Sequence, residues 1–341
     1  MKTIKKKYYL MAFGACIAAF ALTFYYFIFT TFSERTDTQY IYIDSDDTAD
    51  SVFAKLDTIG SRHALNGLRT LARYKSYDQN IRTGRYAITP GKSTLNTFRQ
   101  LRNGQQEPIM LTVPEVRTID RMATILGQRL MIDSTDIASA LGNKALRQEL
   151  GVDSTTLPCL FVPNTYEVFW DVSAIDLLRR MKKEHDAFWN SERQQRAKAI
   201  GLTPDEVCTL ASIVDEETAN NGEKPMIAGM YLNRLKKGML LQADPTVKFA
   251  LGDFTLRRIL NKHLAVDSPY NTYKYAGLPP GPIRVASVKG IDAVLNAAQH
   301  NYLYMCAKED FSGTHNFATT LQEHMKNARR YQQALNQRGI K

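Results

Sequence analysis

Cysteine and histidine are both scarce in this chain of 341 residues. The four cysteines, Cys16, Cys159, Cys208 and Cys306, lie far apart and form no C-x-x-C pair. Because Cys16 falls in an apolar N-terminal segment, an odd number remains, and neither a disulfide framework nor a zinc site is expected. The six histidines show no H-E-x-x-H or comparable spacing. We therefore predict buried free thiols, no metal site and no cofactor.

Long apolar runs are also scarce. Only residues 8–33 form an uncharged stretch that reaches the ~20 residues needed to cross a membrane. Lysines at positions 2, 5, 6 and 7 precede it, the aromatic run "FYYFIF" stands near its far end, and no A-x-A cleavage site follows. These features favour an uncleaved anchor over a cleaved signal peptide. We predict a cytoplasmic tail at 1–7 and a single transmembrane helix at 8–33. By the positive-inside rule, everything from about Glu34 onward then lies on the periplasmic side of the cytoplasmic (inner) membrane.

The charge balance is basic, with a formal net charge of +10. Such a balance often indicates a nucleic-acid partner. The predicted anchor places the basic surface outside the cytoplasm, where anionic lipid or a cell-wall polymer is a better fit. The basic residues are dispersed along the chain, so an ordinary soluble basic surface is the simplest interpretation. We expect no nucleic-acid partner.

The rest of the chain divides into two regions, and neither contains an internal repeat. After a polar linker at 34–40, residues 41–175 interleave strand patterns such as "PIMLTVPE" with helix patterns such as "LNTFRQLRNG". Residues 176–341 are mainly helical, with strand patterns in "NYLYMCAK" and "THNFA". The predicted fold class is therefore α+β, with an N-terminal transmembrane helix, a small α/β region and a mainly helical C-terminal domain with a few strands.

One helical segment, "TPDEVCTLASIVDEETAN", ends in three consecutive acids. Its start is marked by Thr203 as N-cap and Pro204 at the first helical position. With about 100° of rotation per residue, Leu210, Ile213 and Val214 fall within about 60° of Glu217. Glu217 thus continues the apolar stripe, whereas the other two acids, Asp215 and Glu216, are free to face solvent.

A carboxylate at the end of an apolar stripe has two interpretations. It can be structural, capping a neighbouring element or pairing with a base such as Arg234. It can instead be functional, because poor solvation raises the pKa of a carboxyl group and makes Glu217 a general acid near neutral pH.

Two polar segments, "LQADPT" at 241–246 and "SPYNTYKYAGLPPGPI" at 268–283, favour the functional interpretation. Proline and glycine fix the shape of a loop, and tyrosines and amides offer stacking faces and hydrogen bonds, which suits an extended sugar polymer. The alternative is a surface loop between helices.

The motifs "LASIVDEET", "NRLKKGMLLQADPTV", "SPYNTY…GLPPGPI" and "YLYMCAK…GTHNF" resemble those of the endolytic murein transglycosylase family, the YceG-like proteins. The resemblance implies a LysM-like region at 41–175 and a catalytic domain at 176–341. It also implies that the second acid of an E-x-E pair is catalytic, which is Glu217 here. Three positions depart from the family pattern, since Asp215 replaces the commoner glutamate, Val116 a glycine and Asn164 an acidic residue.

The function that this resemblance implies is the cleavage of peptidoglycan glycan strands between N-acetylmuramic acid and N-acetylglucosamine, leaving 1,6-anhydro ends. Glu217 would act first as acid and then as base. A membrane-anchored enzyme of this kind would meet nascent glycan, so termination of strand elongation and partnership with glycan-polymerising synthases are hypotheses. The residues expected to line the cleft and orient glycan are Gln242, Asp244, Thr246, Tyr270, Asn271 and Tyr273, with Asn233 and His315 as weaker candidates for support.

Two competing functions stay open at this point. A glycoside hydrolase would use Asp244 as a second carboxylate and release reducing ends. A non-catalytic wall-binding scaffold would need only the anchor and the LysM-like region.

Overall fold

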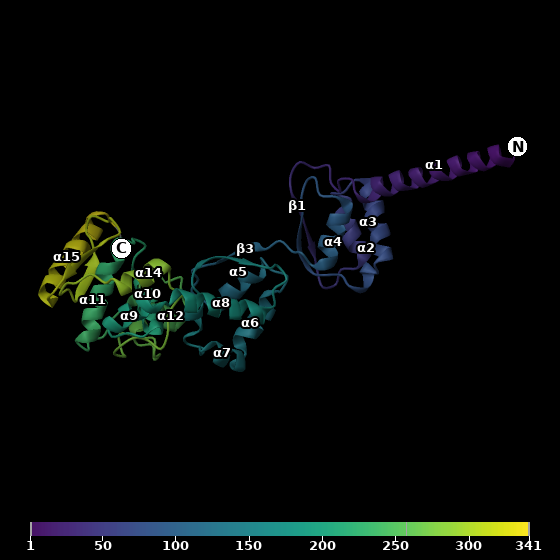
Figure 1. Ribbon diagram of the computed structural model, residues 1–341. Coiled ribbons are helices and arrows are strands. Elements are labelled where there is room, and N and C mark those ends of the chain that lie inside the picture. Colours follow the sequence, from purple (N-terminus) through teal and green to yellow (C-terminus); the bar gives the residue numbers. More distant parts are fainter. Residues whose placement is uncertain (1, 257, 340–341) are drawn as a thin grey trace. The chain divides into compact units, whose positions relative to one another are not determined.

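The computed structural model describes residues 2–256 and 258–339, with side chains from residue 7 onward. Four residues lie outside this description: Met1, Arg257, Ile340 and Lys341. The first belongs to the predicted tail at 1–7, and the last is the end of the predicted catalytic domain. The chain forms two compact units. Unit 1 contains residues 1–111, 129–131 and 166–172, and unit 2 contains residues 112–128, 132–165 and 173–341. Helices alternate with small two-stranded sheets, so the predicted mixture of helices and strands is confirmed (Figure 1).

Unit 1 begins with the long helix α1 (Lys2–Ile28). Its segment Lys7–Ile28 is long and apolar enough to cross a membrane, and only a small share of it is buried against protein. The helix ends at Ile28 rather than at the predicted Ser33. Beyond Ile28 the backbone bonds to the segment before α4 instead of continuing the helix, because the Thr94 amide donates to the Thr30 carbonyl at 3.1 Å.

The core of unit 1 lies between one antiparallel strand pair and three helices. β1 (Gln39–Ile43) pairs with β2 (Gly84–Ile88), and α2 (Ala49–Asp57), α3 (Arg62–Tyr74) and α4 (Thr94–Asn103) pack beside them, with the short helix η1 (Tyr77–Gln79) between α3 and β2. Local signals set the helix ends. Ser93 caps α4, and Gly104 closes it with a φ of 67°, a left-handed conformation that glycine adopts at little cost.

The segment that joins α1 to unit 1 is tied down before the predicted linker begins. The Phe32 amide donates to the carbonyl of Lys92 at 2.8 Å, and the Phe32 carbonyl accepts from Ser61 at 3.0 Å. The carbonyl of Phe27 lies so close to Gly67 of α3 that a Cβ at this position would clash with it. The end of α1 is therefore part of the fold of unit 1.

The chain passes between the units along β3 (Ile109–Val113) and β4 (Asn164–Val168), which form a second two-stranded sheet. Unit 2 continues with α5 (Ile119–Gly127), α6 (Ser134–Gly142), α7 (Lys144–Leu150), η2 (Leu157–Leu160) and α8 (Ala174–Phe188). The predicted boundary between 175 and 176 falls inside α8. Residues 112–165, apart from 129–131, group with the C-terminal part because of long-range contacts such as that of the Val285 amide with the Val116 carbonyl at 2.8 Å. Val116 does not have the positive φ that would require the family's glycine.

The C-terminal part of unit 2 is mainly helical, as predicted. Its elements are α9 (Ser191–Ala199), α10 (Pro204–Glu217), α11 (Lys224–Lys236), α12 (Asp244–Leu251), α13 (Asn261–Leu264), α14 (Val288–Leu295), β5 (Tyr304–Ala307), β6 (His315–Ala318) and α15 (Leu321–Gln337). α10 starts as expected, with a capping box between Thr203 and Glu206. Every residue from 207 to 214 is buried, so α10 is the central helix of this core.

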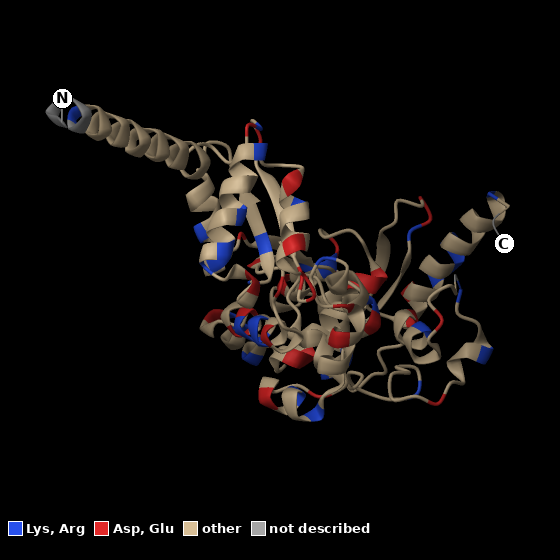
Figure 2. Ribbon diagram, turned by 90° about the vertical axis from the view of Figure 1, so that its right-hand side faces the viewer, with Lys and Arg blue, Asp and Glu red and all other residues tan. Residues whose placement is uncertain are grey.

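Charged residues of both signs are spread over the helices and loops of each unit (Figure 2). This distribution agrees with the dispersed basic residues of the sequence.

Candidate functional site

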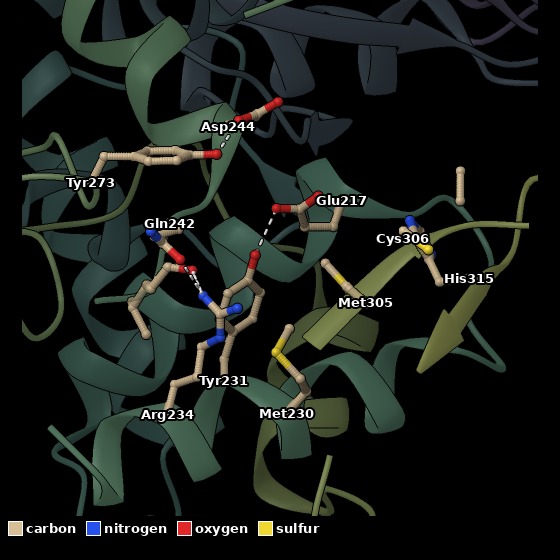
Figure 3. Close-up of a pocket in the computed structure, with 12 residues that line it drawn as sticks. Glu217, Met230, Tyr231, Arg234, Gln242, Asp244, Tyr273, Met305, Cys306 and His315 are labelled. Atoms are coloured by element: carbon tan, nitrogen blue, oxygen red, sulfur yellow. Dashed lines mark hydrogen bonds between the residues drawn. The ribbon is translucent and has the colours of Figure 1, made fainter. Parts of the chain in front are cut away.

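Glu217 is the last residue of α10, and its carboxyl group faces a cavity of about 240 Å³. The cavity lies between α10, α11, the start of α12 and the strand β5, and Figure 3 shows the side chains turned toward it. Its lining residues are Glu217, Met230, Tyr231, Arg234, Leu241, Gln242, Asp244, Tyr273, Met305, Cys306, Ala307 and His315. Five of the predicted site residues are therefore brought together at one place: Glu217, Gln242, Asp244, Tyr273 and His315.

The surroundings of Glu217 favour its protonated form. Burial raises the pKa of Glu217, and the nearby negative charge of Asp244 acts in the same direction. The hydrogen bond from the Tyr231 hydroxyl, at 2.7 Å from Oε1, stabilises the carboxylate and lowers the pKa in part. Among the described residues no Lys or Arg forms an ion pair with Glu217, so burial has the largest effect on its pKa.

Tyr231 was not identified from the sequence. It lies in the buried face of α11, and burial together with the charge of Glu217 raises its pKa well above the ordinary value for tyrosine. The phenol therefore keeps its proton and acts as a hydrogen-bond donor. One signal could have identified it, since a tyrosine within the apolar run "MIAGMYL" needs a polar partner when it is buried.

The prediction that Asp215 and Glu216 face solvent is wrong. The side chain of Asp215 is buried. It forms an ion pair with Lys224 at 2.8 Å and accepts from the backbone amide and the hydroxyl of Ser287 at 2.7 and 2.8 Å. Glu216 binds Arg117 through two bonds, at 2.9 and 2.8 Å, and Arg284 at 3.0 Å. Rotation about a helix assumes one buried face, whereas α10 is surrounded on all sides. The three acids differ in their partners, and Glu217 is the one that faces the cavity.

The opposite wall of the cavity is built by the polar segment at 241–246. Asp244 begins α12 and accepts a hydrogen bond from the Tyr273 hydroxyl at 2.6 Å. Gln242 adopts a φ of 51°, an unusual conformation for a residue with a side chain. Its backbone amide donates to the Thr272 carbonyl at 3.1 Å. These contacts fix Gln242, Asp244 and Tyr273 around the cavity.

Arg234, given as an example of a basic partner in the structural interpretation, does not pair with Glu217. Its guanidinium donates to the backbone carbonyls of Leu303 at 2.6 Å, Leu241 at 2.9 Å and Leu240 at 3.1 Å. It also contacts Oε1 of Gln242 at 3.3 Å. Arg234 thus joins α11 to the chain on two sides of the cavity.

Four other predicted residues lie away from the cavity lining. Thr246 is buried and bonds to the Ala243 carbonyl at 2.7 Å, and Asn271 is buried and donates to the carbonyls of Leu264 and Val266 at 2.9 and 2.8 Å. Tyr270 packs on Phe249, and Asn233 donates to the carbonyls of His300 and Tyr302. These side chains stabilise the loops around the site. A buried amide and a ligand-binding amide look alike in sequence.

Comparisons with known proteins show the family to which the chain belongs. A family model described as the YceG-like family matches residues 41–330. The chain belongs to the YceG-like family. An endolytic murein transglycosylase of Bacillus subtilis (strain 168) is 37% identical over 168 residues, which cover 49% of this chain and 46% of the relative. A protein of the same name from Streptococcus pneumoniae serotype 2 is 29% identical over 290 residues, or 75% of this chain and 51% of the relative.

A YceG-like protein of Listeria monocytogenes has a similar solved structure. The two share 26% sequence identity with a TM-score of 0.55, and the match covers 86% of this chain and 99% of the other. This member of the YceG-like family spans about half the length of the curated relatives that it matches.

Proposed function

We propose that this protein is a membrane-anchored endolytic transglycosylase that cleaves peptidoglycan glycan strands. The observation that carries the proposal is the position of Glu217, a carboxyl group facing a polar cavity, with its pKa raised by burial and with no Lys or Arg paired to it among the described residues. The names of the relatives from Bacillus and Streptococcus support the same activity.

The proposed reaction uses Glu217 twice. Its carboxyl group donates a proton to the glycosidic oxygen between N-acetylmuramic acid and N-acetylglucosamine, the C1–O bond breaks, and an oxocarbenium-like state forms. The resulting carboxylate accepts the proton of the muramic C6 hydroxyl as that oxygen bonds to C1 of the same sugar. A 1,6-anhydro end and a free hydroxyl result, and Glu217 regains its proton. The nucleophile is intramolecular, so little entropy is lost in bringing it to C1.

The other cavity residues have supporting roles in this proposal. Tyr231 holds Glu217 in place through its hydrogen bond, and Gln242, Asp244, Tyr273 and His315 bind the glycan. Asp244 also favours a second candidate function, because a hydrolase that activates water needs a second carboxylate and Asp244 lines the same cavity.

The architecture of the chain suggests how the enzyme meets its substrate. We propose that unit 1 contains the LysM-like region, which its order of strand, two helices and strand supports. α1 would anchor the chain in the cytoplasmic membrane with the lysines inside and both units outside, by the positive-inside rule. Nascent glycan and glycan-polymerising synthases are then the expected partners, and co-purification with such synthases from cells tests that association.

Product analysis on intact glycan strands tests the activity. The purified full-length protein is incubated with peptidoglycan, and the new ends are identified by mass spectrometry. Anhydromuramyl ends support the transglycosylase, and reducing ends support the hydrolase. Binding of glycan without any new ends would leave only a wall-binding scaffold and would overturn the proposal.

The pH dependence of the reaction offers a further prediction. A general acid works in its protonated form, so the rate falls as pH rises through the pKa of Glu217. The Tyr231 hydrogen bond lowers that pKa, so Tyr231→Phe raises it further and moves the alkaline limb of the pH–rate profile to higher pH. The measurement is the rate of formation of anhydro ends as a function of pH. Tyr302→Phe is the control, because it removes a hydroxyl outside the cavity lining and leaves the limb in place. An unmoved limb in Tyr231→Phe would contradict this role.

A further inference from the structure

Glu223 carries a further carboxylate, which contacts the cavity only through His315. It lies directly before α11, and its side chain is 8% exposed. One oxygen, Oε1, accepts the backbone amide of His315 at 2.7 Å. The other, Oε2, lies 3.0 Å from Nδ1 of the His315 ring. Glu223 thus binds both the backbone and the imidazole of a residue that lines the cavity.

These two contacts bear on which ring nitrogen of His315 carries a proton. When Glu223 is ionised, its carboxylate can only accept hydrogen bonds, and Nδ1 then donates its proton to Oε2. In the neutral ring the other nitrogen, Nε2, then has a lone pair and no hydrogen. Among the described residues Nε2 has no hydrogen-bond partner, and the ring stands at the same cavity as Glu217 (Figure 3).

We propose that Glu223 is a positioning residue that makes His315 a hydrogen-bond acceptor for the bound glycan. Nε2 of His315 accepts a proton from a hydroxyl or acetamido N–H of the sugar, and Glu223 prevents the ring from taking the opposite tautomer. This inference rests on the proposed function for the identity of the ligand, a glycan strand. It adds a residue outside the cavity lining to the set that determines substrate binding.

The substitution Glu223→Gln is expected to move the ring proton of His315 from Nδ1 to Nε2. The backbone N–H of His315 is a fixed donor, so it retains the single amide oxygen of the glutamine. The glutamine NH₂ group then faces Nδ1, which must become an acceptor, and the ring proton moves to Nε2. A sugar donor would meet a second donor at Nε2, and glycan binding is expected to weaken by roughly tenfold.

Two measurements test the proposal on the full-length protein. Nitrogen-15 NMR of the histidine rings distinguishes the two tautomers, and loss of a signal in His315→Ala assigns it to His315. We expect Nδ1–H in the wild type and Nε2–H in Glu223→Gln. The same tautomer in both proteins, or Nε2–H in the wild type, would overturn the proposal.

Binding is measured with uncross-linked glycan strands in a Glu217→Gln background, where cleavage does not interfere. We expect weaker binding on adding Glu223→Gln, and no further loss when the same change is added to His315→Ala, because Glu223 acts through His315. Additive losses would indicate a purely structural role and contradict the proposal. The matched control is Glu309→Gln. The Glu309 carboxylate accepts a hydrogen bond from Asn316, the residue after His315, but Glu309 does not line the cavity. Neither the NMR measurement nor the binding measurement requires turnover. Both therefore test the role of Glu223 even if the product analysis finds no anhydromuramyl ends.

Discussion

Glu217→Gln is expected to lower the rate of glycan cleavage by roughly a hundred- to ten-thousandfold, the usual contribution of a general acid–base group. Glutamine has nearly the same size as glutamate, and its carbonyl oxygen can still accept the Tyr231 hydroxyl that now bonds to Oε1 at 2.7 Å. What it lacks is a proton that can be donated to a leaving oxygen. The loss should therefore appear in kcat, with glycan binding and thermal stability largely retained.

The neighbouring acid provides the matched control. Glu216→Gln removes a charge from the same turn of α10, but its carboxylate binds Arg117 and Arg284 and does not line the cavity. We expect this variant to keep most of its activity. The rate of formation of anhydro ends is measured for both variants. If Glu217→Gln cleaved glycan at the rate of Glu216→Gln, Glu217 would not be the catalytic acid.

The second large effect is expected on stability. Asp215→Ala should lower the free energy of unfolding of unit 2 by about 3–5 kcal/mol, because it leaves the buried ammonium of Lys224 without its partner. Ser287 loses two hydrogen bonds in the same change. On one side the Asp215 carboxylate packs against Gly290, where a Cβ would clash with it.

Denaturant unfolding followed by the fluorescence of Trp189 in a Trp170→Phe background is a suitable measurement, because Trp189 is buried in the same core as α10 and Trp170 belongs to unit 1. The control is Glu192→Ala, which breaks an exposed ion pair with Arg196 on α9. Exposed pairs of this kind contribute about 0–1 kcal/mol. A cost for Asp215→Ala as small as that for Glu192→Ala would show that Lys224 finds another partner or reaches solvent.

The start of α10 could be predicted from the sequence, because it depends on a local pattern. Thr203, Pro204 and Glu206 form their cap within a few residues of each other. The surroundings of Asp215 and Glu216 could not be predicted, since their partners Arg117, Arg284 and Ser287 lie far away in the chain. Only the tertiary fold brings these groups to the end of α10.

The polar loops show a similar division. Six residues of "LQADPT" and "SPYNTY" are predicted to orient glycan, and of these six only Gln242, Asp244 and Tyr273 line the cavity. Thr246 and Asn271 satisfy backbone carbonyls inside the loop. An irregular loop leaves many backbone groups without regular partners, and some of its own side chains must bind them. Composition identifies such a loop but does not separate these two roles.

The C-terminal end of α1, which is packed and hydrogen-bonded to unit 1, also determines where the chain can be truncated at its N-terminus. A soluble fragment that begins at Glu34 removes Phe32, which is fully buried in unit 1, together with the backbone bonds to Lys92 and Ser61. It leaves a cavity of aromatic size next to Gly60, whose backbone packs against the Phe32 ring. A fragment that retains residues from about Tyr26 onward keeps this packing. The folded part of unit 1 therefore begins inside α1.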